Sequence, residues 1–239
     1  MQQPVPIWTR ITWRYPQWWL FAISLLAWLA MIAHADSNGA ILDSIHHHHH
    51  GGAFMAMSWT SETYCWMLMV VAMMLPLIAD SARSVATRSL WYRRQRAIVA
   101  FVLGYLSVWL AAGVVVSLIL VGLRSQAWFD SGGALTVSFL AAVGWQFAPL
   151  KKRALIACHR TRPVAPKGLQ ANLGCIRYGW MIGGSCLLNC WAWMVFCVMT
   201  GHYLGVMLFA MFIGVAERYS MRKLRGIAMS PSSLLTSFR

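Results

Sequence analysis

Long apolar runs separated by short basic segments constrain the fold of this chain more than any other feature. Of its 239 residues, 59% are hydrophobic and only 11% are charged, whereas a soluble domain carries about 25% charged residues. So few charged side chains cannot cover a soluble globule of this size, and so apolar a chain is not intrinsically disordered. The pattern predicts an all-α fold, a polytopic helix bundle that crosses a membrane.

Six runs approach the length of about 20 apolar residues that a helix needs to cross a bilayer. They are Gln17–Ala35, Thr63–Ala79, Ala97–Leu123, Gly133–Leu150, Gly179–Thr200 and Tyr203–Ala216. We therefore expect six transmembrane helices in one integral membrane domain that includes the whole chain. Residues 230–239 are expected to form a disordered tail.

The distribution of Lys and Arg predicts the orientation of the bundle. Of the 20 basic residues, 19 lie in the N-terminal tail, the second and fourth connections and the C-terminal tail, and only Arg124 lies in the other three loops. Cytoplasmic segments of membrane proteins carry such an excess of basic residues. Both termini are therefore expected in the cytoplasm, and the protein in a bacterial inner membrane. This distribution also explains the formal net charge of +14 without a nucleic-acid partner.

The first span has an alternative interpretation. Ala33, His34 and Ala35 resemble a signal-peptidase site after an apolar core, with Arg10 and Arg14 ahead of it. Cleavage there would leave five spans. The length of the apolar run and the Pro- and Trp-rich segment before it favour a retained span.

Soft metal donors occur on two of the predicted spans. Cys186 and Cys190 lie one helical turn apart in the fifth span, and Met194 continues the same face; Cys65 and Met69 lie one turn apart in the second. Thiolate and thioether ligands favour Cu(I). If the two spans pack together, these five residues predict a buried copper site.

The first outer loop contains a run of five consecutive histidines. They are His46, His47, His48, His49 and His50. This histidine run is either a low-complexity or engineered segment or a patch that collects metal, since imidazole is a common ligand of copper, zinc and nickel. If the histidine run binds metal, we expect it to receive the ion on the outer side of the membrane.

Two further donors lie in the fourth connection, on the predicted cytoplasmic side. They are Cys158 and the adjacent His159. We expect them to meet the ion on the inner side.

Packing is the simpler explanation for many of these side chains. Methionine stripes in apolar helices usually fill the core, and buried cysteine often behaves as a small hydrophobic residue. Asn189 and Gln146 within the spans either assist a site or form hydrogen bonds with a neighbouring helix.

The chain resembles a bacterial family of predicted metal-binding integral membrane proteins, domain of unknown function 2182, over about residues 59–217. The resemblance is carried by Trp66-Met67, Ala72-Met73-Met74-Leu75-Pro76, Gly104-Tyr105-Leu106, Trp109, Ala142, Trp145-Gln146, Pro149-Leu150-Lys151, Cys158, Gly179, Cys186, Cys190-Trp191, Met194, Gly201 and Glu217. It implies a membrane protein that handles metal, and some members are called copper chaperones. The chain departs from the family by having Asn189 and Ala154 where cysteine is usual.

Three functions follow from these patterns. The preferred one is an inner-membrane protein that binds or transfers a soft metal ion, with copper as Cu(I) the first choice, for a membrane or periplasmic metalloprotein. The second is an assembly or accessory subunit of a larger membrane complex, and the third is a membrane thiol oxidoreductase that uses Cys186 and Cys190. The sequence contains no phosphate-binding loop and no hydrolase or metalloprotease motif. The lack of these motifs favours a protein that is not an enzyme.

Overall fold

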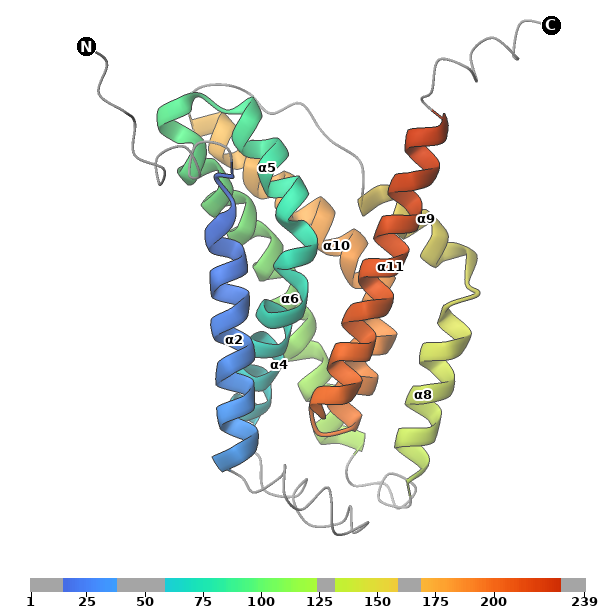
Figure 1. The fold of residues 1–239 in the computed structure, drawn as a ribbon. Helices are drawn as coiled ribbons and strands as arrows, with labels where there is room; N and C mark the ends of the chain where they lie inside the picture. The colour runs from blue at the N-terminus through green and yellow to red at the C-terminus, as the bar shows by residue number, and fades with distance from the viewer. Residues whose placement is uncertain (1–14, 38–58, 124–131, 159–168, 229–239) are drawn as a thin grey trace, which may run out of the picture.

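A computed structural model describes residues 15–37, 59–123, 132–158 and 169–228, and all regular structure in these ranges is helical. The helices, drawn in Figure 1, are α2 (Trp18–Ser37), α4 (Trp59–Met74), η2 (Pro76–Ile78), α5 (Ala79–Arg88), η3 (Trp91–Arg93), α6 (Arg94–Leu123), α8 (Gly133–Trp145), α9 (Pro149–Cys158), α10 (Leu169–Met199) and α11 (Leu204–Ala228). The predicted all-α fold is therefore confirmed for the described part of the chain.

Four segments are long and apolar enough to cross a membrane: residues 18–35, 91–123, 169–199 and 204–221. Two bent pairs would raise this number to six: α4 with η2 and α5, bent by 43°, and α8 with α9, bent by 69°. α2 begins and α11 ends at the same end of the bundle (Figure 1), as an even number of crossings requires. We call this the basic end, because Arg88, Lys152 and Arg177 are exposed near it.

Many large apolar side chains point away from the bundle. Leu26 of α2 is 64% exposed, Leu140 of α8 62% and Phe212 of α11 69%. A soluble protein rarely exposes apolar residues on so many helices at once. This surface is compatible with surrounding lipid.

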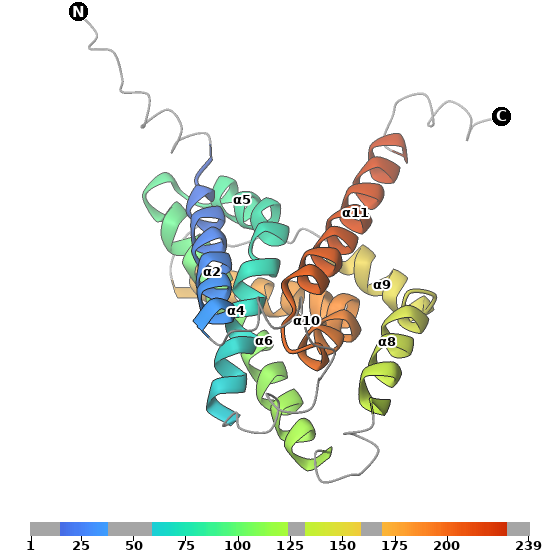
Figure 2. The ribbon, with the colours of Figure 1, turned by 60° about the horizontal axis from the view of Figure 1, so that its bottom comes forward.

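α6 and α10 form the centre of the bundle. Figure 2 shows α10 between α6 on one side and α8 and α9 on the other. Gly104 and Gly179 allow the two central backbones to approach closely, since a Cβ on Gly179 would lie 2.2 Å from the Phe101 carbonyl oxygen. Small residues serve the same purpose in membrane helix pairs.

Pro76 explains the bend between α4 and α5. Proline has no N–H, so the carbonyl of Ala72 four residues earlier loses its helical donor. Ser24 Oγ donates to this carbonyl oxygen at 2.6 Å and Trp28 Nε1 at 3.1 Å. α2 therefore supplies the hydrogen bonds that the broken helix cannot make for itself.

The predicted span over Gly133–Leu150 is not a straight helix, because α8 and α9 meet at an angle of 69°. α8 ends at Trp145, and the next amides bond three residues back, including Phe147 N–H to the Gly144 carbonyl. Pro149 then starts α9 in a new direction, because its fixed φ suits the first position of a helix. The hydropathy of the run does not reveal this turn.

Two other helices extend beyond the predicted spans. α10 begins at Leu169, ten residues before Gly179, and α11 continues past Ala216 to Ala228. Glu217 and Arg218 are therefore helical residues. The predicted tail over residues 230–239 lies outside the described residues.

Candidate functional site

Two buried thiols from different helices meet near the basic end. Cys158 is the last residue of α9 and Cys186 lies near the middle of α10, with 3.6 Å between the sulfur atoms. Cys158 shares the buried face of α9 with Lys151 and Ala154, while Lys152 and Arg153 are exposed. The bend before α9 thus brings this face against α10. We call Cys158 and Cys186 the thiol pair.

Arg218 of α11 connects the thiol pair to the bend between α4 and α5. Its Nη2 donates to Cys186 Sγ at 2.7 Å, and its Nη1 donates to the carbonyl oxygen of Leu77 at 2.5 Å. Hydrogen bonds with a charged donor are stronger than neutral ones. The positively charged guanidinium of Arg218 therefore lies directly beside the sulfur of Cys186.

The count of basic residues predicts Arg218 in the cytoplasmic tail, so its role beside Cys186 was not predicted from the sequence. One signal was present, since Glu217 and Arg218 directly follow an apolar run. Ionisable residues within membrane helices usually face the bundle interior and mark a functional site.

Cys190 and Met194 continue the buried face of α10 beyond Cys186. Together with Met73 and Met74 of α4 they line a small cavity of about 10 Å³, room for roughly one water molecule. Asn189 Nδ2 donates to Cys190 Sγ at 3.4 Å. One thiol and several thioethers therefore converge beside the thiol pair.

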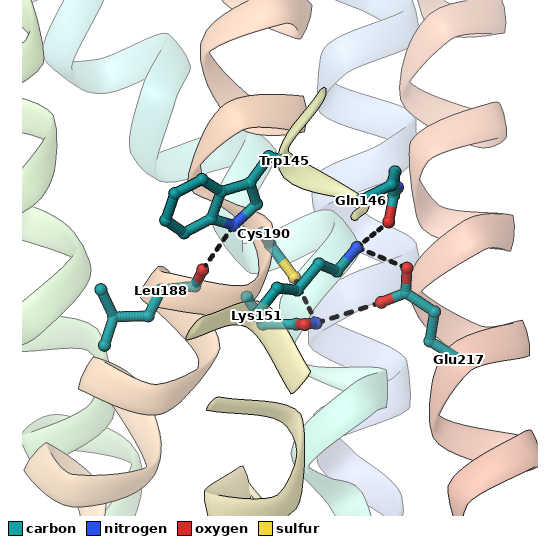
Figure 3. A network of polar contacts seen from close by, with 7 residues as sticks. Trp145, Gln146, Lys151, Leu188, Cys190 and Glu217 are labelled. Carbon is teal, nitrogen blue, oxygen red and sulfur yellow. Dashed lines mark hydrogen bonds and ion pairs between the residues drawn. The ribbon is translucent and has the colours of Figure 1, made fainter. Parts of the chain in front are cut away.

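A buried network of polar side chains borders this small cavity. Lys151 Nζ forms an ion pair with Glu217 Oε1 at 2.5 Å and also donates to Gln146 Oε1. Figure 3 shows the three side chains directed toward one another. Asn189 Nδ2 donates to Glu217 Oε2 at 3.3 Å. The network has no net charge, which reduces the cost of burying it.

An open cavity of about 390 Å³ reaches from the surface near the basic end to Cys158, one member of the thiol pair. Cys158 and Arg218 contribute to its wall, together with Asp80 and Ser84 of α5 and Tyr178 of α10. Cys158 therefore lies in the wall of a cavity that opens to the surface, although both thiols are themselves buried.

The donors predicted on α4 do not join the thiol pair directly. Met69 is fully buried, and Cys65 Sγ lies 3.9 Å from Nε2 of His34 on α2. Within the described ranges, no three His, Cys, Asp or Glu side chains are arranged to hold a metal ion. Metal binding by the predicted set stays a prediction.

Six of the predicted ligands, all histidines, lie outside the described residues, so the structure neither places nor tests them. They are the whole histidine run, namely His46, His47, His48, His49 and His50, together with His159. Their roles in collecting and meeting the ion also stay predictions.

A family model described as "PpoB2: Copper chaperone" matches residues 63–236, nearly three quarters of the chain. The match includes the thiol pair, Arg218 and the polar network. No curated protein and no solved structure matches the chain. The match supports the copper-related part of the resemblance found in the sequence.

Proposed function

The chain belongs to the PpoB2 family of copper chaperones, and from this premise we propose that it binds Cu(I) at the thiol pair within a bacterial inner membrane and passes the ion to a metalloprotein partner. The arrangement of Cys158, Cys186 and Arg218 carries the proposal. Copper is the cargo of this protein, and the two thiols are the groups that hold it.

The distance between the sulfur atoms fits a shared ion. Metal–thiolate bonds of about 2.3 Å allow two sulfur ligands of one ion to lie up to about 4.6 Å apart, and the observed separation is 3.6 Å. Soft thiolates select Cu(I) over hard cations. Cys190 and Met194 lie on the same helix face and are available as further soft donors.

Charge balance also supports the proposal. Two thiolates and one Cu(I) carry a net charge of −1, which is costly in an apolar interior unless it is compensated. The guanidinium of Arg218, already bonded to Cys186 Sγ, supplies the opposite charge. The loaded site would then be neutral and hydrogen-bonded.

Exchange with a partner is proposed at the basic end, because the open cavity leads from there to Cys158. The positive-inside distribution makes this end cytoplasmic. His159 would meet the ion at this end, and the histidine run would collect it on the other side. Cys65 and Met69 remain in the proposal as donors along α4.

Copper binding by the purified full-length chain tests the proposal. Cu(I) is titrated under anaerobic, reducing conditions against a chromophoric chelator, with the chain in detergent. We expect the double variant Cys158→Ser, Cys186→Ser to lose one tightly bound equivalent. Cys175→Ser, which removes another buried thiol of α10, should keep it. Equal copper content in the double variant and the wild type would refute the proposal.

Arg218→Met provides a second measurement at the same site. A hydrogen bond to a charged group contributes about 1.5–3 kcal/mol, so we expect the copper affinity to fall roughly 10- to 100-fold. Arg177→Met, which removes an exposed arginine of α10, is the matched control. Unchanged affinity in the Arg218 variant would contradict the charge argument.

The 3.6 Å separation of the sulfurs also favours a second function, that of a thiol oxidoreductase. The structure pairs Cys186 with Cys158, whereas the sequence suggested Cys190. Oxidation of the pair to one disulfide would release two electrons and two protons, and a membrane quinone is the oxidant that this function requires. Quinone reduction that depends on both thiols, without copper binding, would favour this alternative.

A further inference from the structure

A second group of soft donors lies at the end of the bundle opposite the basic end. There α2 ends, α4 begins, and a turn joins α10 to α11 (Figure 1). His34 is in the last turn of α2, and Cys65 lies on the second turn of α4. His34 Nε2 and Cys65 Sγ are 3.9 Å apart. A nitrogen ligand at about 2.0 Å and a sulfur ligand at about 2.3 Å can share one ion at this separation.

His202 lies at the same end, in the turn between α10 and α11. It has a φ of 61°, a left-handed conformation that is uncommon for a residue other than glycine. Its backbone N–H donates to the Cys197 carbonyl oxygen at 2.9 Å. Its ring nitrogen Nε2 is buried and has no hydrogen-bond partner within the described residues. A strained backbone with an unpartnered buried nitrogen is a frequent feature of binding sites.

His202 lies close to the other two donors. Burial lowers the pKa of its imidazole, and a smaller effect in the same direction comes from His34, so the two histidine rings are near enough to interact electrostatically.

We propose that His34, Cys65 and His202 bind a second Cu(I) ion at this end of the bundle. The inference rests on the proposed copper function and adds a site with mixed imidazole and thiolate ligands. His34 and Cys65 are within ligand distance of one another. The three side chains are not gathered around one point, so binding requires the His202 ring to turn toward the other two. Both ligand types suit copper.

The buried face of α4 links this site to the thiol pair. Cys65, Met69 and Met73 occupy successive turns, about 6 Å apart along the axis, and Met73 lines the small cavity beside Cys190. All three are buried. The thioethers of Met69 and Met73 are thus placed between two thiol-containing sites, and an ion that crosses the bundle would meet soft donors at each turn.

The test counts Cu(I) ions in the purified full-length chain, with His46–His50 replaced by serine in every sample so that this run cannot bind copper. We expect two equivalents in this background and one after Cys65→Ser or His202→Asn. Cys175→Ser serves as the matched control and should retain two. X-ray absorption of the Cys158→Ser, Cys186→Ser variant, which keeps only the new site, should show nitrogen together with sulfur ligands.

The outcomes separate the two proposals. Two equivalents in both the Cys65 and the His202 variants, or only sulfur ligands in the thiol-pair variant, would overturn the second site and leave the thiol pair intact. Two equivalents in the thiol-pair variant would instead overturn the proposed function. If Cys65→Ser fails to fold, the His202 variant and the absorption spectrum still decide. A second site that takes Zn²⁺ but not Cu(I) would overturn the copper assignment.

Discussion

The ammonium group of Lys151 is balanced inside the bundle by the carboxylate of Glu217. The lysine side chain is 5% exposed and the glutamate side chain 21%, with 2.5 Å between Nζ and Oε1. Gln146 and Asn189 provide the remaining hydrogen bonds. The ion pair joins α9 to α11. It holds α9 in the position in which Cys158 contacts Cys186.

Removal of one member of this pair should destabilise the protein strongly. We expect Lys151→Met to lower the free energy of unfolding by about 3–5 kcal/mol, because the largely buried carboxylate of Glu217 then has no positively charged partner. The double variant Lys151→Met, Glu217→Leu should recover most of the loss. Thermal unfolding in detergent, followed by circular dichroism, measures both. A double variant no more stable than Lys151→Met would contradict this explanation.

Single residues of the site were only partly predictable from the sequence. Cys186, Cys190 and Met194 share a face because of their spacing on one helix, which is a local property. The partners of Lys151 and Arg218 include residues far away in the sequence, so counting basic residues assigned both to cytoplasmic connections. Without these two, 17 basic residues remain on that side against Arg124, and the predicted orientation is unchanged.

At the scale of the helices, the close approach of α6 and α10 positions Tyr105 and Cys186 in one core. A methyl group on Gly179 would lie 2.2 Å from the Phe101 carbonyl oxygen and 2.9 Å from the Tyr105 nitrogen. These are backbone atoms that cannot move independently of their helix. The separation of the two central helices is therefore set by glycine at this position.

Gly179→Ala should force the two helices apart. Overpacking of this kind costs about 1–3 kcal/mol, which for a chain of this size lowers the unfolding temperature by at least about 2 °C. Gly184→Ala is the matched control on the same helix, since a Cβ there has no atom within 4 Å. Its unfolding temperature should be unchanged or higher, because alanine favours a helix. Equal effects of the two substitutions would contradict the close-packing argument.

Hydropathy predicted the continuous helices α2 and α6 with nearly their observed bounds. Hydropathy averages over about 20 residues, so it could not detect the turn at Gln146, where successive amides change their hydrogen-bond partners. It also ended the last span at Ala216, because charged residues follow. Those charged residues remain helical because Glu217 and Arg218 find partners on α9, α10 and η2.

At the scale of the whole molecule, the donors form two groups at different depths. The thiol pair lies beneath the cavity that opens near the basic end, and His34, Cys65 and His202 lie at the opposite end. A protein that receives an ion on one side of a membrane and releases it on the other needs such an arrangement. The direction in which an ion would pass between the two groups depends on which end of the bundle faces the cytoplasm.

Labelling of introduced cysteines determines this orientation. We expect Gly52→Cys to react with a membrane-impermeant thiol reagent in intact cells, because the first connection contains no Lys or Arg. Lys167→Cys should react only after the membrane is opened, since it lies in the connection richest in basic residues. The six native cysteines, all buried in the structure, are measured in the parent chain as background. Labelling of Lys167→Cys in intact cells, with Gly52→Cys protected, would reverse the orientation and place the thiol pair nearer the periplasm.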